Sequence, residues 1–272
     1  MTGIADHGDI FRLDGYAAIV TGAGRGIGAA IAESFAGAGA DLTLVARTEA
    51  DLDAVAARVR ALGRSALVLP CDISDVSQAR EVVAQTVAEY GRIDVLVNNA
   101  GGAAPADYLE TTPEALDEAF HFNVSAAFEL IKQATPHLLE SGRASVINVT
   151  SRMDRQASRG MVVYGTVKAA LTHLTHILSL ELAPRVRVNG IAPGVVDTEA
   201  LRRVLGDDLR ADVVSATPLR RLTTVADVAA TARFLASPAA GNISGKIIEV
   251  DGGAEVPTMP DHTPDLRPPS PV

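Results

Sequence analysis

The sequence has little cysteine, no long apolar run and no surplus of positive charge. The single cysteine among its 272 residues, Cys71, excludes an intramolecular disulfide and fits a reducing compartment. Uninterrupted apolar runs of about 18–20 residues are absent, which argues against a membrane-spanning helix. The net charge of −9 disfavours nucleic-acid binding, which requires a basic face. Since the first residues also lack the features of a secretory signal, we expect a cytoplasmic protein that binds neither membranes nor nucleic acids.

A metal-ligand pattern is also missing. The histidines share no ligand spacing with carboxylates or with the cysteine, so we predict no metal site. Cys71 has no neighbouring cation and base to activate its thiol, and we expect it to pack as an inert side chain. The histidines considered are His121, His137, His173 and His176.

The composition, 47% hydrophobic and 21% charged, is that of a globular protein. Apolar runs alternate with segments of helical spacing, which predicts one α/β domain over residues 1–256 and a proline-rich tail over 257–272. The expected strands are 16–21, 41–47, 65–70, 93–99, 144–151, 186–193 and 245–253. The expected helices are one from the first glycine turn to Gly37 or Gly39, then 49–62, one ending near Tyr90, 113–139, 161–183, two short ones within 198–216, and 224–236.

The first apolar run leads directly into a glycine-rich turn. Glycines let the backbone approach phosphates, and the N-terminus of the following helix supplies N–H groups and the positive end of the helix dipole. Strand, turn and helix in this order predict a pyrophosphate site, with a tight turn that binds nothing as the alternative. The candidate residues are Gly22, Gly24, Arg25, Gly26, Ile27 and Gly28.

The end of the second strand indicates which dinucleotide would bind. In NAD-binding sites an acidic residue about 20 positions after the turn binds the ribose 2′-hydroxyl. This sequence has Arg47 there, and Asp41 lies at the opposite end of the strand. Arginine suits a 2′-phosphate, and Arg25 is a second cation that could reach it. We therefore expect NADP(H) rather than NAD(H); the alternative is that both arginines are solvated loop residues.

Polar residues also follow the third and fourth strands. Asp72 is placed to bond an adenine amino group, whereas Asp75 is expected to cap the next helix. The fourth strand ends in NNAGG, which brings Asn98 to the carboxyl edge of the sheet, where parallel sheets bind ligands.

Ser151, Tyr164 and Lys168 form the main catalytic pattern. The serine ends the fifth strand, and the tyrosine and lysine, four residues apart, share one face of a helix. An unperturbed tyrosine has a pKa near ~10, which a close cation lowers. A tyrosine that exchanges protons beside a serine hydroxyl suits carbonyl and alcohol chemistry. The alternative is a partly exposed tyrosine beside a solvated lysine.

Asn123 is an unusual residue for the middle of an expected helix. Asparagine is a poor helix-interior residue. A bent helix with a water-mediated contact and a satisfied core asparagine are both open interpretations.

In combination these motifs resemble the short-chain dehydrogenase/reductase family, over roughly residues 13–253. The family motifs stand here as Thr21-Gly22-x-x-x-Gly26-Ile27-Gly28, Asn98-Asn99-Ala100-Gly101, Asn123, Ser151, Tyr164-x-x-x-Lys168, Asn189, and Pro193-Gly194 with Thr198. The runs NNAGGAAP, VNGIAPGVVDTEAL and TPLRRL are most similar to bacterial 7α-hydroxysteroid dehydrogenases and 3-oxoacyl-carrier-protein reductases.

The resemblance implies a role for each matching residue. Tyr164 would give its proton to a carbonyl oxygen held by Ser151. Lys168 would lower the pKa of the tyrosine and bind the nicotinamide ribose, and Asn123 would hold a water that links Lys168 to solvent. The further residues implied for cofactor binding are Asp72, Ile73, Asn98, Ala100, Gly101, Pro193, Gly194, Val196 and Thr198.

The resemblance also implies a fold and an assembly. The expected fold is a single Rossmann-type, doubly wound domain with a seven-stranded parallel sheet in the order 3-2-1-4-5-6-7 and helices on both faces. The expected assembly is a homotetramer, built through the helices 113–139 and 161–183 and through the last strand with its preceding helix.

The loop after Ser151 departs from the family, which usually has small residues there. Here it reads RMDRQASRG, and we hypothesise that one of its arginines meets an anionic part of the substrate. The alternative is that the arginines are solvated or lie at a subunit contact. The candidate substrate residues are Arg152, Met153, Arg155 and Met161.

The expected function is NADP(H)-dependent interconversion of a ketone and a secondary alcohol. A hydroxysteroid-type substrate and a 3-oxoacyl thioester are both open. A catalytically silent nucleotide-binding regulator is the alternative from another class, and the proline-rich tail could dock a partner or simply be a loosely packed terminus.

Overall fold

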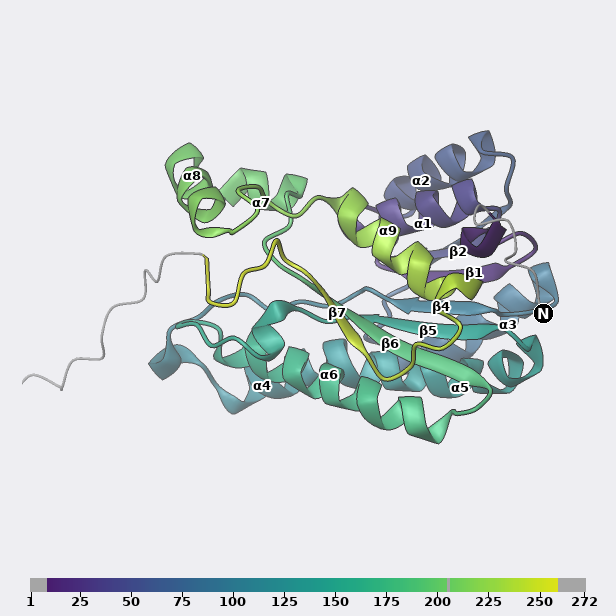
Figure 1. Ribbon diagram of the computed structural model, residues 1–272. Helices are drawn as coiled ribbons and strands as arrows, with labels where there is room; N and C mark the ends of the chain where they lie inside the picture. The colour runs from purple at the N-terminus through teal and green to yellow at the C-terminus, as the bar shows by residue number, and fades with distance from the viewer. Residues whose placement is uncertain (1–8, 205, 259–272) are drawn as a thin grey trace, which may run out of the picture.

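A parallel sheet of seven strands forms the centre of the structure, a computed structural model that describes residues 9–204 and 206–258 (Figure 1). The strands lie in the predicted order, β3-β2-β1-β4-β5-β6-β7, and every neighbouring pair is parallel. Their bounds are β1 (Ala17–Thr21), β2 (Asp41–Ala46), β3 (Ala66–Pro70), β4 (Val95–Asn98), β5 (Ala144–Val149), β6 (Val186–Pro193) and β7 (Ile247–Val250).

Helices cover both faces of the sheet (Figure 1). Helices α1, α2 and α9 pack on one face, and α3, α5 and α6 on the other. Helices α7 and α8 follow β6 and lie to one side of these layers. The bounds are α1 (Gly26–Ala38), α2 (Glu49–Ala61), α3 (Ala79–Tyr90), α4 (Pro113–Phe120), α5 (Ala126–Ser141), α6 (Val162–Glu181), α7 (Glu199–Val204), α8 (Asp207–Ala216) and α9 (Val225–Ala236).

The central strands β1, β4 and β5 are buried at every residue. Helices cover both of their faces, which is why these segments are apolar without a polar alternation. Phe35 of α1 and Leu44 of β2 belong to the core on one face, and Leu96 of β4 and Leu130 of α5 to the core on the other. Each such side chain contributes about 1.5–3 kcal/mol on burial, so the two cores hold the strand ends in fixed positions.

The helices begin and end where local signals place them. Thr112 accepts a hydrogen bond from the Ala115 N–H at the start of α4. Asp75 caps the short helix η2 (Val76–Gln78) through the Ser77 N–H, as predicted. Gly39 ends α1 in the left-handed conformation, with φ of 109°.

The predicted helix over 113–139 is divided into three parts. Between α4 and α5, residues His121–Ser125 form a π-helical turn, η4. A π turn holds one more residue than an α-helical turn, and such turns frequently occur at functional sites. Asn123 lies in this turn, where the regular α-helical hydrogen-bond pattern is interrupted.

Membrane-spanning helices and metal-binding clusters are both absent from the described residues, 9–204 and 206–258. None of their helices combines the length and apolar character needed to cross a membrane. None of their groups of His, Cys, Asp and Glu is arranged to hold a metal ion. Most of the predicted proline-rich tail, residues 259–272, lies outside the described residues.

Candidate active site

Two adjoining cavities open at the carboxyl ends of the strands. The glycine-loop cavity, of about 250 Å³, lies between the turn after β1 and the ends of β2 and β3. The tyrosine cavity, of about 610 Å³, lies between the ends of β5 and β6 and the start of α6. Asn99 and Gly101, just after β4, line both cavities, so the two form one cleft.

The turn after β1 is packed too closely for side chains at two of its glycines. A Cβ at Gly28 would lie 2.2 Å from the Gly22 carbonyl oxygen, and one at Gly22 would lie 2.7 Å from Asn99 Nδ2. At Arg25, the N-cap of α1, no side chain of the described residues caps the helix. The first N–H groups of α1 therefore remain for a ligand, and an anion is stabilised at such a terminus.

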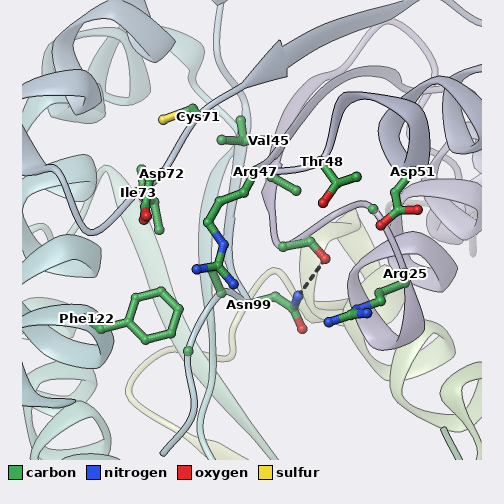
Figure 2. A pocket seen from close by; sticks show the side chains of 15 residues that line it. Arg25, Val45, Arg47, Thr48, Asp51, Cys71, Asp72, Ile73, Asn99 and Phe122 are labelled. Carbon is green, nitrogen blue, oxygen red and sulfur yellow. Dashed lines mark hydrogen bonds between the residues drawn. The ribbon is translucent and has the colours of Figure 1, made fainter. Parts of the chain in front are cut away.

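Arg47 extends from the end of β2 into the glycine-loop cavity, and Arg25 faces it from the glycine turn (Figure 2). Thr48 and Asp51, at the start of α2, also line this cavity. Hydrogen bonds from Ser74 lower the pKa of the Asp72 carboxyl, and the charge of Arg47 lowers it further. The cavity thus combines two guanidinium groups with carboxylates, a set suited to a ligand that carries both phosphate and hydrogen-bond donors.

Ser151 and Tyr164 meet in the tyrosine cavity. Ser151 follows β5, Tyr164 stands in the first turn of α6, and both residues line this cavity. Burial raises the pKa of Tyr164, the Ser151 hydroxyl lowers it in part, and the Asp154 carboxylate raises it further. The predicted lowering by Lys168 is not among these causes, and the pKa of Tyr164 lies above its ordinary value.

Lys168 is buried one helical turn beyond Tyr164, as the spacing predicts. The residue is only 4% exposed, and burial lowers its pKa to about 8. Its Nζ donates a hydrogen bond to the Val149 carbonyl oxygen at 3.1 Å and lies 5.9 Å from the centre of the Tyr164 ring. A cation with its pKa this close to neutrality can take part in proton exchange near pH 8.

Asn123 connects the π turn to the loop after β4. Its Nδ2 donates to the carbonyl oxygens of Ala119, at 2.8 Å, and Gly102, at 3.0 Å, and its Oδ1 accepts from the Gly102 N–H at 2.8 Å. A Cβ at Gly101 would lie 2.6 Å from Asn123 Oδ1 and 3.1 Å from Lys168 Nζ. The interpretation of a satisfied core asparagine therefore applies, because backbone groups satisfy its amide beside Lys168, and the water-mediated contact stays a prediction.

Most of the sequence-predicted residues line this cleft. Those in the glycine-loop cavity are Gly22, Gly24, Arg25, Arg47, Asp72, Ile73, Ala100 and Gly101. Those in the tyrosine cavity are Ile27, Gly101, Ser151, Tyr164, Lys168, Pro193, Gly194, Val196 and Thr198. Gly26 stands at the start of α1 beside Arg25, and Gly28 packs under Gly22. Met153 and Met161 flank the start of α6 without lining either cavity.

Asn98 occupies a different environment from the one we predicted. It is the last residue of β4, it is buried, and its Nδ2 donates to Asn148 Oδ1 at 2.9 Å. Asn148 in turn donates to Thr175 Oγ1 at 2.8 Å. This chain of polar groups joins β4, β5 and α6 beneath the cleft, and the next residue, Asn99, lines the cleft instead.

The arginines of the departing loop contact the C-terminal segment of the same chain. Arg152 is buried, and its Nη2 donates to Thr258 Oγ1 at 3.1 Å and to the Val256 carbonyl oxygen at 3.4 Å. Arg155 forms ion pairs with Glu249 and Glu255. Neither arginine is among the residues that line the tyrosine cavity. The structure thus shows a structural use for both side chains, as an anchor for residues 254–258.

Several residues of the cleft are not predicted by the sequence patterns. Asn99 belongs to a family motif and directly follows the strand end, a position that could have marked it as a cavity residue. Thr48 and Asp51 fit an ordinary helix start, and the closeness of Asp51 to Gly24 depends on the packing of α2 against the turn. The other lining residues that were not predicted are Val45, Ala46, Cys71, Phe122, Val149 and Thr150.

The fold and the cleft define a Rossmann-type α/β oxidoreductase. A family model described as enoyl-(acyl carrier protein) reductase matches residues 22–255. An uncharacterized oxidoreductase of Mycobacterium tuberculosis is 49% identical over 95% of this chain and 99% of its own length. The 7alpha-hydroxysteroid dehydrogenase of Escherichia coli K12 is 36% identical over 91% of this chain and 97% of its own length. The chain belongs to the short-chain dehydrogenase/reductase family.

Solved structures show the same relationship. The structure of a 7 alpha-hydroxysteroid dehydrogenase complexed with NADH and 7-oxo glycochenodeoxycholic acid superposes with a TM-score of 0.89 at 35% sequence identity, covering 93% of this chain and 98% of that chain. A short-chain type dehydrogenase/reductase from Mycobacterium marinum gives a TM-score of 0.85 at 32% identity, covering 92% of this chain and 99% of that chain.

Proposed function

We propose that this chain is an NADP(H)-dependent oxidoreductase that interconverts a ketone and a secondary alcohol, with Tyr164 as its general acid and base. The observation that carries the proposal is that Ser151, Tyr164 and the buried Lys168 line one cavity. This cavity continues into the glycine-loop cavity, whose closely packed turn suits a pyrophosphate.

In this proposal the protein positions the reacting groups and manages the proton. The dinucleotide, when bound, supplies or accepts the hydride. Ser151 orients the carbonyl oxygen, and Tyr164 gives that oxygen its proton during reduction and takes it back during oxidation. Lys168 supports the phenolate and binds the ribose, and Asn123 holds the loop after β4 in place beside Lys168.

Arg47 supports NADP(H) over NAD(H). Its guanidinium lies in the glycine-loop cavity together with that of Arg25, where a 2′-phosphate would be placed (Figure 2). The relative of known structure was solved with NADH. The preference of this chain therefore rests on its own arginines and is tested by comparing NADPH and NADH directly.

The tyrosine cavity favours a substrate whose reacting part is uncharged. Among its described lining residues, Lys168 alone carries a charge, and several of the other side chains are apolar, such as Ile27, Val196 and Leu201. A hydroxysteroid-type ketone fits this lining better than the phosphopantetheine arm of a 3-oxoacyl carrier-protein thioester. The related hydroxysteroid dehydrogenase was solved in complex with 7-oxo glycochenodeoxycholic acid, which supports the same substrate class.

A panel of simple ketones, oxosteroids and 3-oxoacyl thioesters, assayed with NADPH and NADH in parallel, tests the cofactor and the substrate class together. Faster turnover with NADH across the panel would contradict the NADP(H) proposal. The Tyr164→Phe variant tests the catalytic assignment: undiminished turnover in this variant would favour the alternative, a dinucleotide-binding regulator without Tyr-dependent catalysis.

We also propose a homotetramer in the cytoplasm. Exposed apolar side chains on α5 and α6, namely Phe128, Ile177 and Leu180, are available for contacts between subunits. The single cysteine fits a reducing compartment. Sedimentation of the purified protein would show the oligomer directly.

A further inference from the structure

We propose that Asp154 is a positioning residue for the Tyr164–Lys168 pair, acting as the counterion of the buried Lys168 ammonium. The proposal rests on the proposed function, because it concerns the pH at which Tyr164 exchanges its proton. Asp154 stands in the segment where this chain departs from the small residues usual in its family.

Local geometry fixes Asp154 beside the pair. The short helix η5 (Arg152–Asp154) follows Ser151 directly, and the Asp154 N–H donates to the Ser151 carbonyl oxygen at 2.9 Å. The Asp154 carboxylate accepts a hydrogen bond from Thr172 Oγ1. Thr172 lies four residues after Lys168 and eight after Tyr164, so all three share one face of α6. The carboxylate is therefore held at the end of the row formed by the tyrosine and the lysine.

The charges around Asp154 are set by three elements. Its charge acts on Tyr164 and Lys168 of α6, and the charges of Arg155 in the loop and Glu249 of β7 act on it. Arg155 is paired with Glu249, which offsets the negative charge of that glutamate. Burial raises the pKa of Asp154, and the hydrogen bond from Thr172 opposes the rise.

The Asp154 carboxylate raises the pKa of both Tyr164 and Lys168. Burial lowers the pKa of Lys168 to about 8, and Asp154 opposes this by stabilising the ammonium. Asp154 raises the pKa of Tyr164 because it disfavours a second negative charge nearby. With the carboxylate in place, the pair therefore keeps its protons to a higher pH than it would without it.

The Asp154→Asn variant tests this role, because it removes the charge and keeps the size of the side chain. In the direction of alcohol oxidation, activity rises with pH as the pair loses its proton. We expect the midpoint of the kcat/KM profile to move to lower pH by about one pH unit in Asp154→Asn. Glu255→Gln is the matched control: it makes the same change of charge at an exposed side chain near the loop, and its midpoint should stay that of the wild type.

A purely structural role would give a different result. If Asp154→Asn lowers kcat at every pH without moving the midpoint, the proposal is overturned. Thr172→Val, which leaves the charge but removes its anchor, provides a second measurement should Asp154→Asn fail to fold. Its midpoint should move in the same direction by a smaller amount, and an unmoved midpoint would then overturn the proposal.

Failure of this inference can be told apart from failure of the proposed function. An active wild type, an inactive Tyr164→Phe and overlapping profiles for wild type and Asp154→Asn would remove the role of Asp154 alone. Full activity of Tyr164→Phe would instead remove the catalytic assignment on which the inference rests.

Discussion

Ser151 and Tyr164 line the same cavity at the end of β5, and the Ser151 hydroxyl lowers the pKa of the tyrosine against the effect of burial. We predict that Ser151→Ala reduces kcat by about 10²–10³-fold, as the loss of a donor to a reacting oxygen does. The midpoint of its pH profile should move upward, opposite to that of Asp154→Asn. Stopped-flow or steady-state assays across pH measure both effects. Ser158→Ala, in the same loop, is the control, and a downward shift in Ser151→Ala would contradict the assignment.

Arg47 provides a prediction about cofactor choice. A charge-assisted bond to a 2′-phosphate is worth about 1.5–3 kcal/mol, so Arg47→Ala should raise the KM for NADPH about 10–100-fold. The KM for NADH should change little, because NADH lacks the phosphate. Arg58→Ala removes another arginine of the same region, one that pairs with Glu33 outside the glycine-loop cavity, and should leave both values unchanged. Equal rises in the KM values for NADPH and NADH in Arg47→Ala would show that the arginine does not bind the 2′-phosphate.

Burial of the charged Lys168 side chain should destabilise the folded protein, although the reaction requires this residue. Its pKa falls from an ordinary 10.5 to about 8, which corresponds to about 3 kcal/mol of unfavourable burial for the charged form. We predict that Lys168→Met abolishes turnover and raises the melting temperature of the protein below pH 8. Between pH 8 and 10.5 the unfolded chain binds the proton more tightly than the folded one, so wild-type stability should rise with pH and the difference should shrink. Calorimetry at several pH values measures it, and a lower melting temperature for Lys168→Met at neutral pH would contradict this.

Arg152 joins the loop after Ser151 to the C-terminal segment. Arg152→Ala leaves the buried Thr258 hydroxyl without its partner, and we predict a loss of about 1–3 kcal/mol in the free energy of unfolding. Arg155→Ala should cost less than about 1 kcal/mol, because its ion pairs are exposed. Urea unfolding of the two variants compares them.

Truncation after Gly253 removes the same contacts from the other side. It should lower stability to a similar extent as Arg152→Ala, and adding Arg152→Ala to the truncated chain should then have little further effect. Independent, additive losses would show that Arg152 and the segment after Gly253 do not act as one unit. Activity and oligomer size measured on the same proteins would show whether this segment also matters for function.

Most of the fold could be predicted because it is determined by local sequence signals and by the burial of the sheet between two layers of helices. Strands buried on both faces must be apolar throughout, and residues such as Thr112 and Asp75 mark helix starts by bonding backbone groups within three positions. The shared face of Tyr164 and Lys168 follows from helical spacing alone. These parts of the site depend on few contacts between distant residues.

The remainder depends on packing between distant segments. Two adjacent asparagines stand at the end of β4, and only the pairing of Asn98 with Asn148, fifty positions away, decides that Asn99 lines the cleft. The anchoring of Arg152 involves partners more than a hundred positions away. The carboxylate of Asp154 meets Thr172 only because the loop folds back onto α6. Local pattern carries no information about such contacts.

The π-helical turn at His121–Ser125 contains one residue more than a regular α-helical turn. This extra residue sets the rotation of α4 relative to α5 about the helix axis. Deletion of one residue within the turn would allow a regular α-helix to form across it. Every residue on one side of the deletion would then rotate by about 100° relative to the other side, and the side chain of Asn123 could no longer reach both Ala119 and Gly102. A change of length in this turn would therefore displace Asn123 from its backbone partners without any substitution of Asn123 itself.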